Sequence, residues 1–172
     1  MASSDRLDVE PHIAGLLRYA RSLTRDPVAA DDLVQEALLR AFERAESYDR
    51  SRPLRTWLFA ILHNEFINAG RQRKAEERRD SALASARVDE VDADQELSAY
   101  LAQIARRFDG LPEPQRAVLH LVAVEGLGYR ETAEALDIAI GTVMSRLSRA
   151  RAALREAERP VAANLHVVGS EE

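Results

Sequence analysis

The chain has 172 residues, 46% of them hydrophobic and 31% charged, which is apolar enough for a globular core and excludes a wholly disordered protein. It has no cysteine, which excludes disulfides and thiolate zinc sites, and the 5% of aromatic residues favours helices over a sheet. The net charge of −5 does not exclude nucleic-acid binding, because two basic clusters flank an acidic block. We expect an all-α protein.

Three helices are predicted in the N-terminal half. Apolar residues recur at helical spacing from Ile13 to Leu23, and Asp26 followed by Pro27 is typical of a cap and first position of a second helix. A polar loop over residues 46–53 precedes a long third helix, which begins at Leu54. The second helix has one apolar stripe, predicted to be core: Ala30, Leu33, Val34, Ala37, Leu38 and Ala41.

A flexible linker is predicted over residues 80–96, which are small, acidic and polar and lack a sustained apolar period. Two further helices follow, ended by Gly110 and Gly126. The chain is therefore expected to form two small helical domains, residues 8–79 and 97–159, joined by this acidic linker.

The segment from Tyr129 to Arg155 predicts a helix-turn-helix. Its first helix would turn three side chains inward, the turn would span 137–139 with Ile138 filling the core, and the second helix would have an apolar inner stripe. The inward residues are Tyr129, Ala133 and Leu136, followed by Val143, Leu147, Ala150 and Leu154. Any surface helix needs a polar face, but the turn and the inner stripe favour DNA binding over a merely solvated helix.

Both halves resemble the extracytoplasmic-function sigma factors, which are group IV of the sigma-70 family. Three N-terminal strings resemble the family's region 2: Arg18 to Asp26, Ala30 to Glu36 and Leu54 to Leu62. The string from Gly141 to Arg151 resembles its region 4. The resemblance extends from about residue 10 to residue 158, and the two regions occur in the family's order.

The resemblance implies a subunit that binds core RNA polymerase, directs it to promoter DNA and helps to melt the minus-10 region. A stress or envelope response and control by an anti-sigma factor that wedges between the domains are implied as well. No covalent chemistry is implied, so we expect a protein that is not an enzyme and has no cofactor, metal or small-molecule substrate.

The resemblance also implies three sets of site residues. The set for core polymerase, on the second helix, is Asp32, Leu33, Gln35, Glu36 and Leu39. The set for the minus-10 element is Tyr48, Arg50, Asn64, Asn68, Arg71, Arg73 and Lys74, with Trp57 interpreted as core rather than as a stacking platform. The set for the minus-35 element is Thr142, Ser145, Arg146, Ser148 and Arg149, whose donors suit base edges and phosphates.

Four positions depart from the family pattern. Met144 stands where a basic residue is common, and Asp137 stands where a turn glycine is frequent, although Asp tolerates the left-handed conformation. Gly128 and Ala139 lack the capping hydroxyl often found before these two helices.

Two other classes of protein remain as alternatives. An operator-binding regulator would share the helix-turn-helix, but it leaves the loop and the second-helix surface unexplained. An enzyme has less support, because the four histidines show no metal-ligand spacing and no phosphate loop or nucleophile motif is present. The sequence has no signal-peptide pattern and no apolar run long enough to span a bilayer, so we expect a cytoplasmic protein without membrane insertion.

Overall fold

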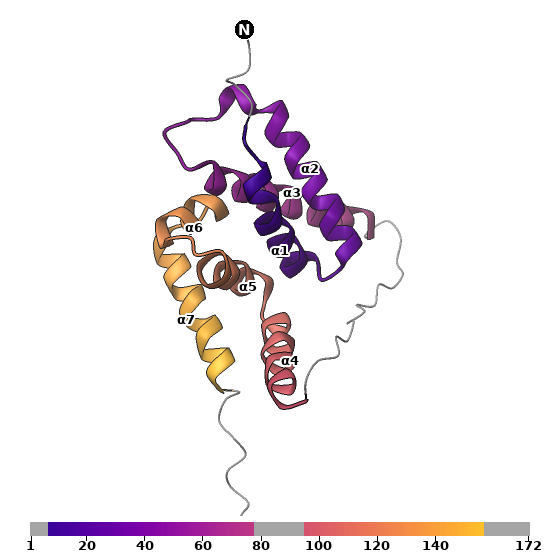
Figure 1. The fold of residues 1–172 in the computed structure, drawn as a ribbon, viewed down its shortest axis with the longest axis vertical. Coiled ribbons are helices and arrows are strands. Elements are labelled where there is room, and N and C mark those ends of the chain that lie inside the picture. Colours follow the sequence, from indigo (N-terminus) through magenta and orange to yellow (C-terminus); the bar gives the residue numbers. More distant parts are fainter. Residues whose placement is uncertain (1–6, 78–94, 157–172) are drawn as a thin grey trace, which may run out of the picture.

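The structure, a computed structural model, describes residues 7–77 and 95–156, and the described part of the chain contains helices and loops only (Figure 1). The predicted linker, apart from its last two residues, and the C-terminal tail after residue 156 lie outside the described residues. The helices are η1 (Glu10–His12), α1 (Ile13–Thr24), α2 (Pro27–Glu43), η2 (Ala45–Ser47), α3 (Leu54–Glu77), α4 (Gln95–Gly110), α5 (Glu113–Leu119), the π-helical η3 (His120–Val124), α6 (Tyr129–Leu136) and α7 (Ile140–Glu156).

Helices α1 to α3 form an N-terminal bundle whose boundaries follow local signals. Arg25 ends α1 in a left-handed conformation, with φ of 57°. The Asp26 carboxylate accepts from the amides of Val28 and Ala29 at 2.8 and 3.2 Å, so the predicted N-cap of α2 is confirmed. The apolar stripe of α2 packs inward between α1 and α3.

Helices α4 to α7 form a C-terminal bundle that contains the predicted helix-turn-helix. Asp137 adopts φ 50° and ψ 50°, which confirms the expected left-handed turn residue, and the amide of Ile138 donates to the Ala133 carbonyl at 3.0 Å. Val143, Leu147 and Ala150 are buried on the inner face of α7. The glycine at the start of α6 is compensated, because the Glu131 carboxylate accepts from the Gly128 amide at 2.7 Å.

The predicted inner face of α6 was wrong at Tyr129, which is 37% exposed. The buried residues are Thr132, Ala135 and Leu136. Helix α6 packs against α3 as well as against α7, so its buried face is set by two neighbours rather than by the following helix alone.

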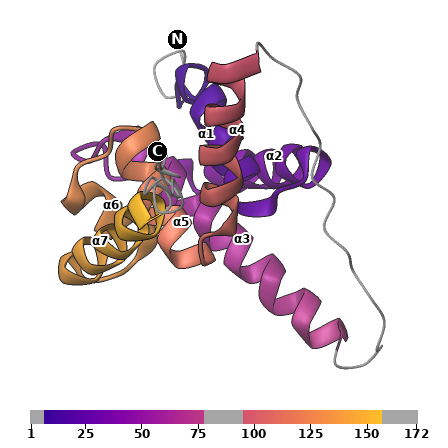
Figure 2. The same cartoon turned by 90° about the horizontal axis from the view of Figure 1, so that it is seen from below.

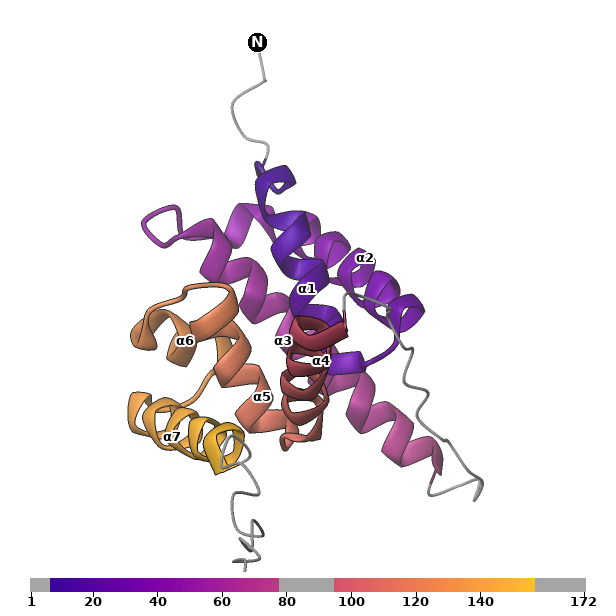
Figure 3. The ribbon, with the colours of Figure 1, turned by 60° about the horizontal axis from the view of Figure 1, so that its bottom comes forward.

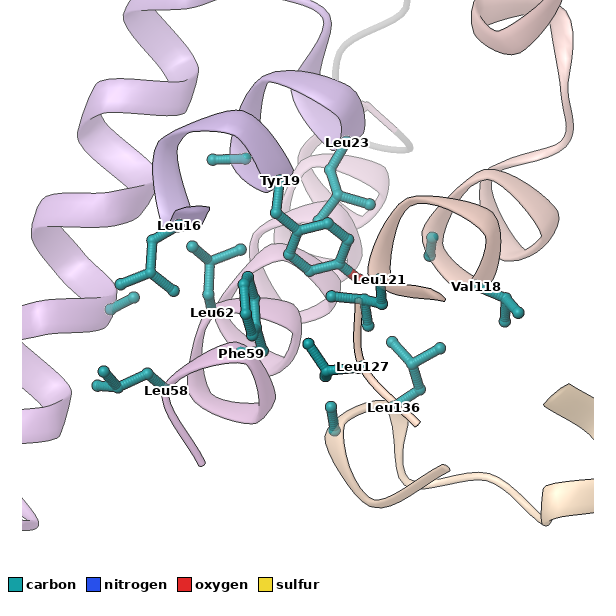
Figure 4. Close-up of a cluster of buried hydrophobic side chains, with 14 of the residues drawn as sticks. Leu16, Tyr19, Leu23, Leu58, Phe59, Leu62, Val118, Leu121, Leu127 and Leu136 are labelled. Carbon is teal, nitrogen blue, oxygen red and sulfur yellow. The ribbon is translucent and has the colours of Figure 1, made fainter. Parts of the chain in front are cut away.

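The two bundles pack directly on each other, with α6 against α3 and with α5 and η3 against α1 (Figures 2 and 3). Their apolar side chains form one continuous cluster in which Tyr19 and Phe59 meet Leu121, Leu127 and Leu136 (Figure 4). The C-terminal end of α3 projects beyond this packed body (Figure 2).

The same substitution at a buried and an exposed leucine tests this core. Leu62 is fully buried in α3, so Leu62→Ala should lower the free energy of unfolding by about 2–5 kcal/mol through lost contacts and a cavity. Leu39 in α2 is 52% exposed, so Leu39→Ala should change it by less than about 0.5 kcal/mol. Urea unfolding followed by circular dichroism measures both, and equal losses would contradict this placement of the core.

Candidate nucleic-acid interface

The five residues predicted for the minus-35 element lie together on α7. Ser145, Ser148 and Arg149 are exposed, while Thr142 and Arg146 are partly buried. The Ser145 hydroxyl donates to the Thr142 carbonyl at 3.0 Å, within the first turns of the helix. Because Val143 and Leu147 hold the opposite face in the core, this polar face is fixed on a rigid element.

Two apolar side chains extend the same surface. Met144 is 54% exposed and Ile140, one turn earlier, is 43% exposed. The position at which a basic residue was expected therefore presents an exposed thioether side chain, which can contact an apolar group such as a thymine methyl but offers no charge to a phosphate.

Most of the residues predicted for the minus-10 element line α3. Asn64, Asn68, Arg71 and Arg73 are all exposed, and the last two belong to the last two turns of α3. The side chain of Lys74 lies outside the described residues. Amides that can read base edges therefore precede guanidinium groups that can neutralise phosphates along one helix.

The loop predicted to capture a base is anchored by an aromatic pair. The rings of Tyr48 and Trp57 lie 4.8 Å apart between centroids, and the Tyr48 hydroxyl donates to the Arg52 carbonyl. Trp57 packs against the core, as the sequence predicted. Arg50 at the tip of the loop is exposed.

The surface predicted for core polymerase needs one correction. Asp32, Gln35 and Leu39 are exposed, and Glu36 is partly buried and pairs with Arg40 at 3.2 Å. Leu33, in contrast, is only 9% exposed, because it shares the inward face of α2 with the core residues Val34 and Ala37. A groove between α2 and α3 is lined by members of two predicted sets, namely Asp32 and Glu36 with Asn68 and Arg73.

A buried carboxylate joins the two bundles. The side chain of Glu125, at the end of η3, has no exposed surface. Its Oε1 accepts from Arg18 Nε at 2.9 Å and its Oε2 from Arg18 Nη2 at 3.0 Å, while Arg55 donates to Oε2 at 3.0 Å and to the Glu125 carbonyl. Arg18 belongs to α1 and Arg55 to α3, so one side chain of the C-terminal bundle ties down two helices of the N-terminal bundle.

The charge state of this cluster follows from its contacts. Burial alone would raise the pKa of Glu125, but the hydrogen bonds and charges of the two arginines outweigh it, so the pKa is held below its usual value. Nε2 of His120 lies 3.3 Å from the same carboxylate, yet burial keeps the pKa of His120 below its usual value. The cluster is therefore an ionised Glu125 between two guanidinium groups, beside a neutral imidazole at neutral pH.

A second polar contact crosses the same interface. Arg116 in α5 is 3% exposed, and its Nε donates to the Ser22 carbonyl at 2.6 Å in the last turn of α1. Its Nη1 donates to the Leu111 carbonyl at 2.7 Å. The carbonyls at a helix C-terminus carry partial negative charge, so this guanidinium stabilises the end of α1.

Comparison with known proteins identifies the family. The model of sigma-70 region 2 matches residues 9–76 and that of sigma-70 region 4 matches residues 101–154. The chain is 34% identical to the ECF RNA polymerase sigma factor EcfG of Rhodopseudomonas palustris, over the whole chain and 91% of that protein. It is 38% identical to SigL of Mycobacterium tuberculosis over 85% of the chain and 84% of that protein.

The chain belongs to the extracytoplasmic-function sigma factors of the sigma-70 family. A solved structure of the sigma factor RpoE in complex with the anti-sigma factor NepR, from Bartonella quintana, superposes with a TM-score of 0.78 and 30% identity. The match covers 90% of the chain and 96% of RpoE, so both regions of the sigma factor superpose together. Among the described residues, no helix is long and apolar enough to cross a membrane.

Sequence analysis missed the contacts that join the two sigma regions. Glu125 lies 107 residues from Arg18 and 70 residues from Arg55, so no periodic pattern links them. Arg116 stands beside the apolar residues Ala117 and Val118 at the start of a short helix, which was the one local sign of a buried charge.

The core of the sigma factor contains a histidine that should make its stability depend on pH. Nδ1 of His63 shares a hydrogen bond with the Tyr19 hydroxyl at 3.0 Å. Burial, and to a smaller extent the charge of Arg146, lowers the pKa of His63 from 6.5 to about 4. Between these values the unfolded chain binds more protons than the folded chain, so stability is complete above about pH 6.5 and falls as the pH is lowered toward 4.

At pH 5 this difference in pKa should lower the free energy of unfolding by about 2 kcal/mol. Urea unfolding should therefore show a lower midpoint at pH 5 than at pH 7.5. His63→Gln keeps an acceptor for Tyr19 and should flatten this pH dependence, whereas His12→Gln, at the end of η1 and outside the core, should leave it unchanged. A pH dependence unaffected by His63→Gln would rule out this source.

Proposed function

We propose that this sigma factor contacts the minus-35 promoter element through α7 and the minus-10 element through α3 and the loop before it. The observation that carries this proposal is the exposed polar face of α7, held by a packed inner stripe and paired in one chain with a region 2 bundle. The factor supplies promoter choice and strand separation, and the polymerase supplies the chemistry, so the chain is not an enzyme.

The two DNA surfaces differ in the work that they do. On α7, Arg149 and the two exposed serines offer hydrogen bonds to base edges and phosphates in a duplex groove. On α3 and its loop, Arg71 and Arg73 neutralise backbone charge while Tyr48 and Asn64 meet unpaired bases of the separated strand. We expect this activity in the cytoplasm, where promoters and polymerase are found.

Core polymerase docks on the exposed face of α2. Asp32, Gln35 and Leu39 combine a carboxylate, an amide and an exposed apolar side chain on successive turns, which is the mixed composition of a protein interface. Leu33 supports this face from below through the core. The groove toward Asn68 and Arg73 supports a polymerase position beside the predicted minus-10 surface.

An anti-sigma factor controls the protein. The support is the likeness to RpoE, which was solved with the anti-sigma factor NepR, over both regions of the chain. The bundles of this chain touch directly through Glu125, Arg18 and Arg55, so the inhibitor binds across the packed pair rather than filling a space between the bundles.

Run-off transcription with purified core polymerase on genomic fragments tests the function. The chain should give discrete transcripts that require both it and the polymerase. An operator-binding regulator would instead bind a duplex site by itself and add no new transcript. Absence of any chain-dependent start site, with tight duplex binding by the chain alone, would favour the regulator.

The α2 face generates a prediction with a neighbouring control. Asp32→Ala should weaken binding to core polymerase by at least about tenfold, since it removes a charged contact at the interface. Asp31→Ala removes another exposed carboxylate one position earlier and should leave the affinity within about twofold. Fluorescence anisotropy of labelled factor with core polymerase measures both, and equal effects would remove Asp32 from the interface.

The α7 face generates a second prediction. Arg149→Ala should reduce transcription from promoters with a matched minus-35 element by about tenfold to a hundredfold, because each good base or phosphate contact contributes about 1–3 kcal/mol. Arg151→Ala, also exposed on α7 but outside the predicted set, should have a smaller effect. If promoters with scrambled minus-35 elements lost as much activity in Arg149→Ala, this residue would have no role in minus-35 recognition.

A further inference from the structure

The outward side of α7 carries an apolar strip made of Ile140 and Met144. The two residues are one turn apart, so they lie on the same side of the helix and about 6 Å apart along its axis. They are 43% and 54% exposed, whereas the neighbouring Val143 is fully buried. Met144 lies about 100° around the helix from Val143, so it does not belong to the inner stripe that packs in the core.

The strip is continuous with the residues proposed to contact the minus-35 element. Ser148 lies one turn after Met144 on the same side, and Ser145 is the next residue around the helix. Both serines are exposed, and so is Arg149. A helix that enters the major groove with these hydroxyl and guanidinium groups therefore carries Met144 into the groove as well.

The group in the major groove that matches an apolar side chain is the C5-methyl group of thymine. The other groups that distinguish the bases there are hydrogen-bond donors and acceptors. An apolar side chain placed against them would remove their water without replacing the hydrogen bonds, which is unfavourable. Placed against the methyl group, the same side chain buries apolar surface on both partners. The unbranched side chain of methionine is flexible enough to adapt to the position of that methyl group.

The surroundings of the strip favour DNA over a protein as its partner. A helix that packs into an apolar groove of another protein presents apolar side chains over successive turns. On α7 the strip ends after one turn, because Ser148 and Arg151 follow on the same side. A single apolar contact within a polar and basic face suits a base edge surrounded by phosphates.

We propose that Met144 selects a thymine in the minus-35 element by packing against its C5-methyl group, and that Ile140 shields this contact from water. This inference rests on the proposed contact between α7 and the minus-35 element, to which it adds a residue that determines specificity. T·A and A·T pairs carry the methyl group on opposite strands, so the contact distinguishes them from each other as well as from G·C pairs.

Selection on a promoter found by run-off transcription, with its minus-35 element randomised, tests the proposal. Holoenzyme formed by core polymerase and the unaltered chain should enrich a thymine at one position. With Met144→Ala this preference alone should be lost, while the other positions keep theirs. Val124→Ala shortens another exposed apolar side chain, which is 52% exposed in η3 and lies outside α7, and it should leave every preference unchanged.

Deoxyuridine at the selected position removes the methyl group and leaves the hydrogen-bonding groups of the base pair in place. For holoenzyme with the unaltered chain, this change should weaken promoter binding about threefold to fivefold, which corresponds to one methyl group removed from a packed contact. Holoenzyme with Met144→Ala should bind the two duplexes equally. Electrophoretic mobility shifts at one fixed salt concentration measure all four affinities.

A charged and an uncharged substitution test whether position 144 faces the DNA. Met144→Lys exchanges the methyl contact for a positive charge, so it should lose the thymine preference and steepen the slope of log affinity against log salt concentration by about 0.9. Met144→Gln is uncharged and of similar length, so it should lose the preference and keep the slope. An unchanged slope for Met144→Lys would place position 144 away from the DNA.

Three further results would overturn the proposal: no preference that depends on Met144, a deoxyuridine effect of the same size in Met144→Ala, or weaker binding of Met144→Ala to core polymerase without DNA. The last result would identify the strip as a protein contact. Preferences that depend on Arg149 but not on Met144 would overturn this inference alone. If the proposed function of α7 failed, no minus-35 sequence would be enriched and Arg149→Ala would change nothing, so the two failures are distinguishable.

Discussion

One buried carboxylate constrains the arrangement of this molecule. Removing Glu125 from water is unfavourable unless its charge is met, and two guanidinium groups from different helices meet it at 2.9–3.0 Å. Because Arg18 is in α1 and Arg55 in α3, the carboxylate can be satisfied only when the C-terminal bundle sits in one orientation on both helices. Apolar packing alone would tolerate sliding, since dispersion and burial are not directional.

Helix α1 is, with α3, one of the two N-terminal helices that contact the C-terminal bundle. Its Leu16 and Ala20 complete the core of the N-terminal bundle, and its Ser22 carbonyl receives Arg116 from α5. Tyr19 contacts both bundles. The centroid of its ring lies 5.5 Å from that of Phe59 in α3 and 5.4 Å from that of His120 in η3. A change in how α1 packs on α3 therefore reaches α5 and η3 through direct contacts, one a hydrogen bond and the other between aromatic rings.

The features that could be predicted from sequence depend on neighbours a few residues apart. The Asp26 cap, the left-handed Asp137 and the inner stripe of α7 each follow from local chemistry or from the 3.6-residue period, and each is present. Tyr129 was placed on the wrong face, because the buried face of α6 is chosen partly by α3. Leu33 was assigned both to the core stripe of α2 and to the surface for core polymerase, and its burial agrees with the core stripe. The Glu125 cluster was out of reach, since its members are separated by 70 to 107 residues and no spacing relates them.

The π-helical turn before Glu125 has a consequence for how this sequence can vary. In η3 the amide of Glu125 donates to the carbonyl of His120, five residues earlier, at 3.0 Å, so the turn holds one residue more than an α-helical turn. Removing a single residue from positions 120–124 would restore regular α-helical winding and leave the carboxylate about one turn after His120, where it lies now. Loss of one codon there would keep the charge aimed at α1, whereas loss of one codon from the regular winding of α5 would turn the following carboxylate by about 100° around the helix axis.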